Sequence, residues 1–288
     1  MPPHHPVPPG ASPAGRRAAV LGSPVAHSLS PVLHRAAYAE LGLTDWTYER
    51  FEVDESGLAA FLRGTDARWA GFSLTMPLKR AVIPLLDEVS PTAAAIEAVN
   101  TVLLSGGGRR TGENTDVPGM IAALRERGVE RVEHAAVLGA GATASSALAA
   151  LAEICSGEVT TYVRSAHRAR EMRGWGERLG VPVRVADWAE AAGALSAPLV
   201  IATTPAGSTD ALVAAVPARP GTLFDVLYDP WPTPLAAAWS RSGGRVVAGL
   251  DLLVHQAVLQ VELMTGHSPA PLAAMREAGE AALHARTA

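Results

Sequence analysis

Segments with strand-like and helix-like hydrophobic spacing alternate along the first part of the chain. The segments with helical spacing lie at 31–41, from 58 onward and at 79–86. The predicted strands between them lie at 18–21, 46–53, 71–75 and 99–104. This alternation is typical of an α/β fold in which helices cover a sheet of parallel type. Residues 105–108 form a turn signal at the end of this first unit.

A second unit of the same kind follows a predicted linking helix that begins after Val117 and runs to about residue 127. Predicted helices lie at 143–151 and 166–179. The strands predicted around them lie at 135–138, 159–163, 199–202, 223–226 and 246–248. This order of elements predicts a Rossmann-type domain. The segments 250–264 and 271–286 read as two further helices, which need not stay with the domain that they follow.

A glycine-containing turn joins the first strand of this second unit to its first helix. Gly139 is suited to the tight turn, Gly141 to close approach of a pyrophosphate, and Ala144 to close packing of helix and sheet. The helix N-terminus adds unpaired N–H groups for an anion. An ordinary Gly/Ala-rich turn is the competing interpretation. The predicted cofactor loop comprises Gly139, Ala140, Gly141, Ala142, Thr143 and Ala144.

The end of the next strand indicates which dinucleotide binds. An Asp or Glu there would accept a hydrogen bond from the ribose 2′-hydroxyl of NAD, but Arg164, Ser165 and Arg168 follow Val163 instead. Guanidinium groups and a hydroxyl suit a 2′-phosphate. The residues therefore predict NADP, although a solvated basic helix start is an alternative because Arg170 and Arg173 follow.

Polar residues cluster at predicted strand ends in the first unit. Because loops after successive strands meet at one edge of an α/β sheet, these side chains could converge on a single ligand rich in hydroxyl groups. They are Ser28, Ser30, Thr75, Lys79, Asn100, Asn114 and Asp116.

Seven ordered motifs resemble those of the shikimate dehydrogenase family. Four lie in the first unit, at 22–31 (GSPVAHSLSP), 73–79 (SLTMPLK), 98–101 (AVNT) and 112–116 (GENTD). Three follow at 204–207 (TPAG), 228–235 (YDPWPTPL) and 249–256 (GLDLLVHQ). The resemblance covers nearly all of the chain after its N-terminal segment.

The resemblance implies a two-domain α/β oxidoreductase that transfers a hydride between NADPH and shikimate or 3-dehydroshikimate. It implies a shikimate-binding catalytic domain at 16–118 together with about 250–288. The Rossmann NADP-binding domain would be 119–249, and residues 1–15 would be a flexible tail.

The resemblance also implies a role for each matching residue. Lys79 and Asp116 would be the catalytic pair. Ser28 and Ser30 would hold the substrate carboxylate. The remaining implied contacts are Thr75, Asn100, Asp116 and Gln256 with the ring hydroxyls, and Tyr228, Thr204 and Gly249 with the substrate or cofactor edge.

The chemistry itself requires a proton acceptor when a secondary alcohol loses a hydride. Burial disfavours the charged form of Lys79, whereas a nearby Asp116 carboxylate favours it, so the sequence leaves open which of the two holds the proton. Asp116 is also a candidate N-cap for the helix that begins near Val117.

Composition narrows the set of partners. The net charge of −4 disfavours nucleic acid and anionic membranes, and no run of about 18 apolar residues predicts a membrane span. The single cysteine, Cys155, excludes an internal disulfide and fits a cytoplasmic location. We expect no metal, because His27, His34 and His255 lack ligand-like spacing. We expect a small-molecule substrate and a monomer or homodimer.

Two other functions stay open at this point. A quinate or quinate/shikimate dehydrogenase would act on a substrate with one more hydroxyl, and the paired serines 28 and 30 favour shikimate over it. A catalytically silent NADP-binding sensor could share the same fold. The presence of both Lys79 and Asp116 argues against the silent protein.

Overall fold

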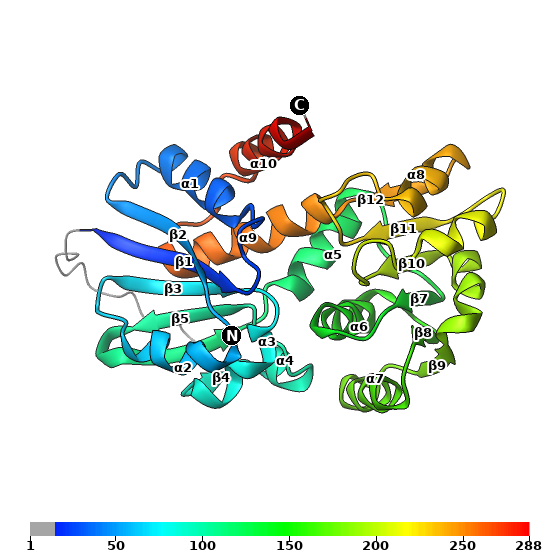
Figure 1. Cartoon of the computed structure of the whole chain (residues 1–288), viewed down its shortest axis with the longest axis horizontal. Coiled ribbons are helices and arrows are strands. Elements are labelled where there is room, and N and C mark those ends of the chain that lie inside the picture. Colours follow the sequence, from blue (N-terminus) through cyan, green and yellow to red (C-terminus); the bar gives the residue numbers. More distant parts are fainter. Residues whose placement is uncertain (1–14, 288) are drawn as a thin grey trace.

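Two six-stranded sheets lie side by side in the computed structural model, which describes residues 15–287 (Figure 1). Helices cover both sheets, so the predicted two-domain α/β class is confirmed. The tail predicted at 1–15 lies outside the described residues, except for Gly15.

The first sheet is mixed, with the strand order β2-β1-β3-β5-β6-β4. The expected parallel pairing holds for β1 with β2 and β3 and for β4 with β6, but β5 runs antiparallel to both β3 and β6. The β5–β6 hairpin turns through Gly107 and Gly108, which adopt the positive φ values of 85° and 81° that glycine tolerates. The strands are β1 (Arg16–Gly22), β2 (Trp46–Glu52), β3 (Trp69–Leu74), β4 (Glu88–Val89), β5 (Thr101–Ser105) and β6 (Arg109–Glu113).

The helices of this sheet begin where its strands end. The predicted helix 79–86 is instead a short α-helix followed by a 3₁₀ turn, because Pro84 has no N–H to continue the helical hydrogen bonds. The helices are α1 (Ser30–Glu40), α2 (Glu55–Arg63), α3 (Leu78–Ala81), η1 (Ile83–Leu85) and α4 (Pro91–Ala95).

The second sheet is entirely parallel, with the order β12-β11-β10-β7-β8-β9. The strand order changes direction at β7, and ligands of such sheets bind beyond the carboxyl ends of the strands at this point. The strands are β7 (Ala135–Leu138), β8 (Val159–Val163), β9 (Val183–Asp187), β10 (Leu199–Ala202), β11 (Thr222–Asp225) and β12 (Arg245–Val247).

The helices around the second sheet are α6 (Ala142–Ile154), α7 (Ala166–Leu179), η3 (Trp188–Ser196), η4 (Asp210–Ala215) and α8 (Pro234–Arg241). The two predicted helices, α6 and α7, are found at nearly their expected bounds. The 3₁₀ helices η3 and η4 and the α-helix α8 were not predicted.

Three long helices tie the two halves together. They are α5 (Asp116–Glu126), α9 (Gly249–Thr265) and α10 (Leu272–Thr287). Figure 1 shows α5 and α9 running between the sheets, while α10 lies beside α1. Buried Leu33 of α1 packs with Val261 of α9 and Met275 of α10, so the C-terminal helices return to the first sheet as the family resemblance implied.

Candidate active site

A buried ion pair forms the centre of the site. The Lys79 ammonium donates a hydrogen bond to Oδ2 of Asp116 over 2.6 Å, and the two side chains are only 15% and 8% exposed. Lys79 lies in α3, just after β3, and Asp116 is the first residue of α5, just after β6. The structure thus brings together the two residues predicted as the catalytic pair.

Asn100 fixes the other oxygen of Asp116. Its Nδ2 donates to Oδ1 of Asp116 over 2.9 Å, and its own Oδ1 accepts the backbone N–H of Thr115 over 2.8 Å. Asn100 is 2% exposed, so these bonds lie away from water. The Asp116 carboxylate is therefore held on one oxygen by an amide and on the other by an ammonium.

Asp116 does not cap α5: it is the first residue of the helix, and Thr115 stands at the N-cap without a side-chain cap. Oδ1 of Asn114 accepts the N–H of Val117 over 3.0 Å, while its Nδ2 donates to the Ala98 carbonyl over 2.8 Å. The alternative role for Asp116 as helix cap is therefore wrong. Because Asn114 satisfies the helix end, the Asp116 carboxylate is left to Lys79 and Asn100.

Gln256 reaches the same cluster from α9. Its Oε1 lies 3.4 Å from the Thr115 hydroxyl, and its Nε2 donates to the Leu253 carbonyl over 2.8 Å. Thr115 was missed as a site residue, although it lies in the 112–116 motif directly before Asp116. Its hydroxyl also accepts from Asn100 over 2.9 Å, so it joins α9 to the centre of the site.

Of the predicted carboxylate-binding serines, Ser28 lies in the loop between β1 and α1, and Ser30 is the first residue of α1. The N–H of Ser30 lies 3.3 Å from Oγ of Ser28, and Ser30 is buried at the start of α1. Tyr228 comes from the loop after β11, yet it lies near the backbone of Leu29, between the two serines. Burial raises the pKa of Tyr228 above its usual value, so this phenol is neutral. Thr75 follows β3 and is half-buried.

The nucleotide turn lies at the carboxyl end of β7. Gly139 adopts a φ of +113°, and a Cβ there would lie 2.6 Å from Oγ1 of Thr203 and 3.2 Å from Cγ2 of Thr204. Gly141 differs, since a Cβ on it would meet nothing within 4 Å. Gly141 is the N-cap of α6, and no side chain caps this helix. The start of α6 therefore has no side-chain cap and leaves room beside Gly141, as an anion site requires.

The other four residues of the predicted cofactor loop differ in burial. Ala144 is fully buried against the sheet, as expected for close helix packing. Ala140, Ala142 and Thr143 are half-buried.

The predicted 2′-phosphate residues lie exposed at the start of α7. Oγ of Ser165 caps this helix by accepting the N–H of Arg168 over 3.3 Å. The Arg164 guanidinium lies 4.8 Å above the ring of Trp188, and Arg168 pairs with Glu171 over 2.7 Å. Trp188 and Glu171 were not predicted as part of the site.

Gly249 lies where α9 begins beside the loop after β11. A Cβ at this position would collide with the backbone of Val226 and Leu227. The close approach of the two segments explains why glycine stands here.

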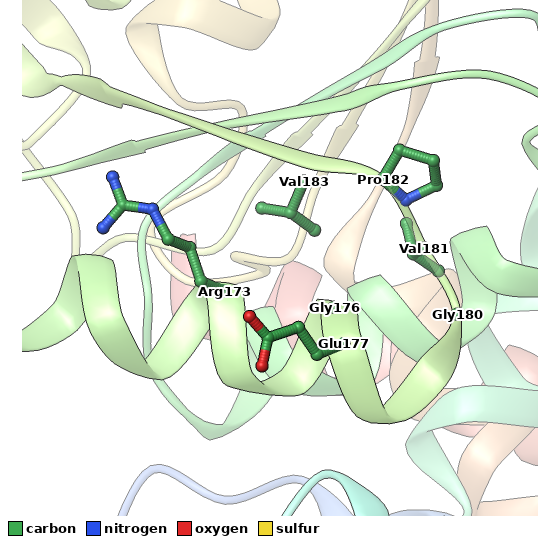
Figure 2. A pocket seen from close by; sticks show the side chains of 7 residues that line it. All are labelled: Arg173, Gly176, Glu177, Gly180, Val181, Pro182 and Val183. Atoms are coloured by element: carbon green, nitrogen blue, oxygen red, sulfur yellow. The ribbon is translucent and has the colours of Figure 1, made fainter.

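None of the predicted site residues lines either of the described cavities. One of about 370 Å³ is lined by the second half of α7 and the segment leading into β9, remote from Arg164 (Figure 2). Another of about 540 Å³ lies between Ser23, Glu52 and Phe61. Residues 15–287 contain no group of three His, Cys, Asp or Glu side chains placed to hold a metal. No helix in that range is long and apolar enough to cross a membrane.

Two family models match separate parts of the chain. Residues 20–102 match the shikimate dehydrogenase substrate binding domain. Residues 249–278 match the shikimate 5'-dehydrogenase C-terminal domain.

Curated relatives match over nearly the whole chain. The shikimate dehydrogenase (NADP(+)) of Moorella thermoacetica is 38% identical, over 89% of this chain and 90% of its own length. That of a Synechococcus species is 35% identical, over 91% and 93%. The chain belongs to the shikimate dehydrogenase family. The predictions of an NADP-dependent shikimate dehydrogenase and of NADP as its cofactor are confirmed.

Solved structures of the family have the same fold. Mycobacterium tuberculosis shikimate dehydrogenase superposes with a TM-score of 0.85 at 40% identity, covering 92% of this chain and 99% of that chain. The Thermus thermophilus enzyme, solved with NADP(H) and shikimate, gives a TM-score of 0.81 at 34% identity, covering 93% and 99%. A quinate dehydrogenase from Corynebacterium glutamicum gives 0.79 at 26% identity, covering 93% and 99%.

Proposed function

We propose that this shikimate dehydrogenase catalyses the reversible NADPH-dependent reduction of 3-dehydroshikimate to shikimate, a step of aromatic amino-acid biosynthesis. The buried Lys79–Asp116 pair supports this proposal most directly. Residues 16–118 with about 250–288 form the substrate domain, and 119–249 form the NADP domain. The enzyme acts in the cytoplasm as a monomer or homodimer.

The substrate lies over the carboxyl ends of the first sheet's strands. Ser28 and Ser30 bind its carboxylate, with the phenol of Tyr228 beside them. The ring hydroxyls are bound by Thr75, Asn100, Asp116 and Gln256. The contacts among Asn100, Thr115 and Asp116 support this role, because they hold donors and acceptors in place before the substrate arrives.

Lys79 donates and accepts the proton that accompanies hydride transfer. In the reductive direction the carbonyl carbon gains a hydride, and its oxygen takes a proton from the Lys79 ammonium. In the oxidative direction the neutral amine accepts the hydroxyl proton as the carbon loses its hydride. The 2.6 Å contact between Lys79 and Asp116 supports this role, since the carboxylate fixes the position of the amine.

The chain's residues fit an NADP molecule. The uncapped start of α6 and the open space above Gly141 suit the pyrophosphate, and the loop from Gly139 to Ala144 surrounds it. Arg164, Ser165 and Arg168 bind the 2′-phosphate, while Thr204 and Gly249 line the nicotinamide side. When bound, this cofactor supplies the hydride.

The test is the rate of NADPH formation at 340 nm with purified protein, comparing shikimate with quinate and NADP with NAD. We expect turnover with shikimate and NADP that falls by about 10²- to 10⁴-fold in Lys79→Ala, the usual contribution of a positioned acid or base. A preference for quinate would assign the sister activity. NADP binding without turnover on either substrate would identify a silent binding protein.

A further inference from the structure

Gln260 is a buried amide with all of its hydrogen-bonding groups engaged. It lies on α9, four residues after Gln256 and on the same face of the helix, and is 1% exposed. Its two N–H groups and its carbonyl oxygen each have partners within 3.3 Å. An amide bonded on both ends is fixed in orientation, so it can hold its neighbours in fixed positions in turn.

One end of Gln260 holds the ring-hydroxyl side of the site. Its Nε2 donates to Oγ1 of Thr101 over 2.9 Å and to the carbonyl of Asn100 over 3.3 Å. Thr101 in turn donates to Oδ1 of Asn100 over 2.9 Å. Because Asn100 bonds to Asp116, Gln260 acts on the catalytic carboxylate through a chain of three hydrogen bonds.

The other end of Gln260 holds the carboxylate side. Its Oε1 accepts from the Ser73 hydroxyl over 2.6 Å, and Ser73 accepts from the Tyr48 phenol over 2.6 Å. The Ser30 side chain lies near that phenol. Tyr48 and Ser73 are 0% and 4% exposed, so no water competes for these bonds.

His34 completes the acceptor end of Gln260. Its Nε2 lies 3.3 Å from Oε1, and burial lowers its pKa to about 3, so the ring is neutral at physiological pH. Since Oε1 can only accept, Nε2 carries the ring proton, which leaves Nδ1 as an acceptor without a donor. The ring stacks on Tyr48 at 3.9 Å between centroids, which fixes the phenol from one side.

We propose that Gln260 is a positioning residue that couples the two halves of the shikimate site, acting through Thr101 and Asn100 on one side and through Ser73 and Tyr48 on the other. The proposal rests on the proposed function, because it assumes that Ser30 and Asn100 contact the substrate. The amide fixes the distance between the groups that bind the carboxylate and those that bind the hydroxyls. It touches neither substrate nor cofactor itself.

The experiment measures shikimate and NADP kinetics for Gln260→Leu, for the single-arm variants Tyr48→Phe and Thr101→Val, and for the corresponding double variants. We expect each single-arm variant to raise the shikimate KM about three- to tenfold, as the loss of one buried hydrogen bond would. We expect Gln260→Leu to raise the shikimate KM further and to lower kcat. The NADP KM stays within about twofold, because no bond of this network reaches the nucleotide turn.

Double variants and a matched control test the coupling. Adding Tyr48→Phe or Thr101→Val to Gln260→Leu raises the shikimate KM less than the same change does in the wild type, because the hydrogen bonds from Gln260 to that side of the site are already lost. The control is Thr161→Val in β8, which is equally buried but whose hydroxyl has no hydrogen-bond partner. It leaves both KM values unchanged.

Three outcomes overturn the proposal. Additive effects in the double variants, or an equal rise in the KM values for shikimate and NADP, would show that Gln260 only supports the fold. If Gln260→Leu does not fold, unchanged shikimate KM values in both single-arm variants overturn it as well. Full activity of Lys79→Ala would instead overturn the proposed function, which keeps the two failures separate.

Discussion

The substrate side and the nucleotide side of this enzyme are built in different ways. On the substrate side, buried polar side chains hold one another. Asn100, Asp116 and Gln260 are buried, and each bonds to at least two other groups. On the nucleotide side the turn presents backbone amides and small residues, and exposed Arg164 and Arg168 extend from the start of α7.

This difference predicts how each side responds to substitution. A buried polar group that loses its partner costs about 1–3 kcal/mol in stability, so changes on the substrate side affect folding and catalysis together. Exposed arginines have no such constraint, so changes on the nucleotide side affect cofactor binding alone. Glycines on the nucleotide side are an exception where the backbone conformation or a neighbouring segment excludes a side chain, because substitutions there also affect stability.

The largest expected effect comes from breaking the Lys79–Asp116 ion pair. Asp116→Asn leaves the Lys79 charge half-buried without its partner and removes the group that fixes it. We expect kcat to fall by about 10²- to 10⁴-fold in the 340 nm assay. The control is Glu158→Gln, which breaks an exposed ion pair with Arg184 in the second sheet and leaves kcat unchanged. Near-normal turnover by Asp116→Asn would exclude it from catalysis.

The next effect is a dependence of stability on pH that comes from the substrate side. The pKa of His34 is about 3 in the fold, against 6.5 when exposed, because burial disfavours the charged ring. Between these values the unfolded chain binds a proton that the fold does not, so stability falls as pH drops from about 6.5 to 3. The slope contributed is at most about 1.4 kcal/mol per pH unit.

Urea unfolding between pH 7 and 4 measures this contribution. His34→Phe keeps a ring against Tyr48 but cannot take up a proton, so its stability should fall less steeply with acid. Parallel curves for the two proteins would show that His34 is protonated in the fold at these pH values.

A pair of glycines separates folding from cofactor binding within the nucleotide turn. Gly139→Ala forces a side chain into a positive-φ conformation beside Thr203, which should cost about 1–3 kcal/mol in urea unfolding. Gly141→Ala should leave stability within about 0.5 kcal/mol, since its Cβ meets nothing, yet raise the NADP KM. Equal loss of stability in both would contradict the distinction.

The smallest effect concerns Trp188 beneath Arg164. A cation–π contact at an exposed site is worth about 0.5–1 kcal/mol, so Trp188→Leu should raise the NADP KM about two- to fivefold. The NAD KM should not change, because NAD has no 2′-phosphate. Trp188→Phe keeps an aromatic face and should stay closer to the wild type. A similar rise in the KM values for NADP and NAD would show that Trp188 acts only through packing.

The central strands of the second sheet were predictable from sequence. The segments 135–138 and 199–202 match β7 and β10 because strands buried on both faces appear as short apolar runs, and 159–163 matches β8, which is rich in β-branched residues. Strands β4, β6 and β9 were missed, since they are short or polar, and β4 and β9 lie at sheet edges. The antiparallel β5–β6 hairpin likewise depended on pairing that no local pattern shows.

The sequence by itself determined the chemistry available to this protein. The types and order of Lys79, Asp116, the Gly139–Ala144 turn and the Arg164 cluster were enough to predict the family and the cofactor, because these groups lie in short motifs. Only the tertiary structure decided how the site is held. Gln260 bonds to Ser73 and Asn100 from 187 and 160 residues away, and such pairings arise from helix and sheet packing, which leaves no local trace in the sequence.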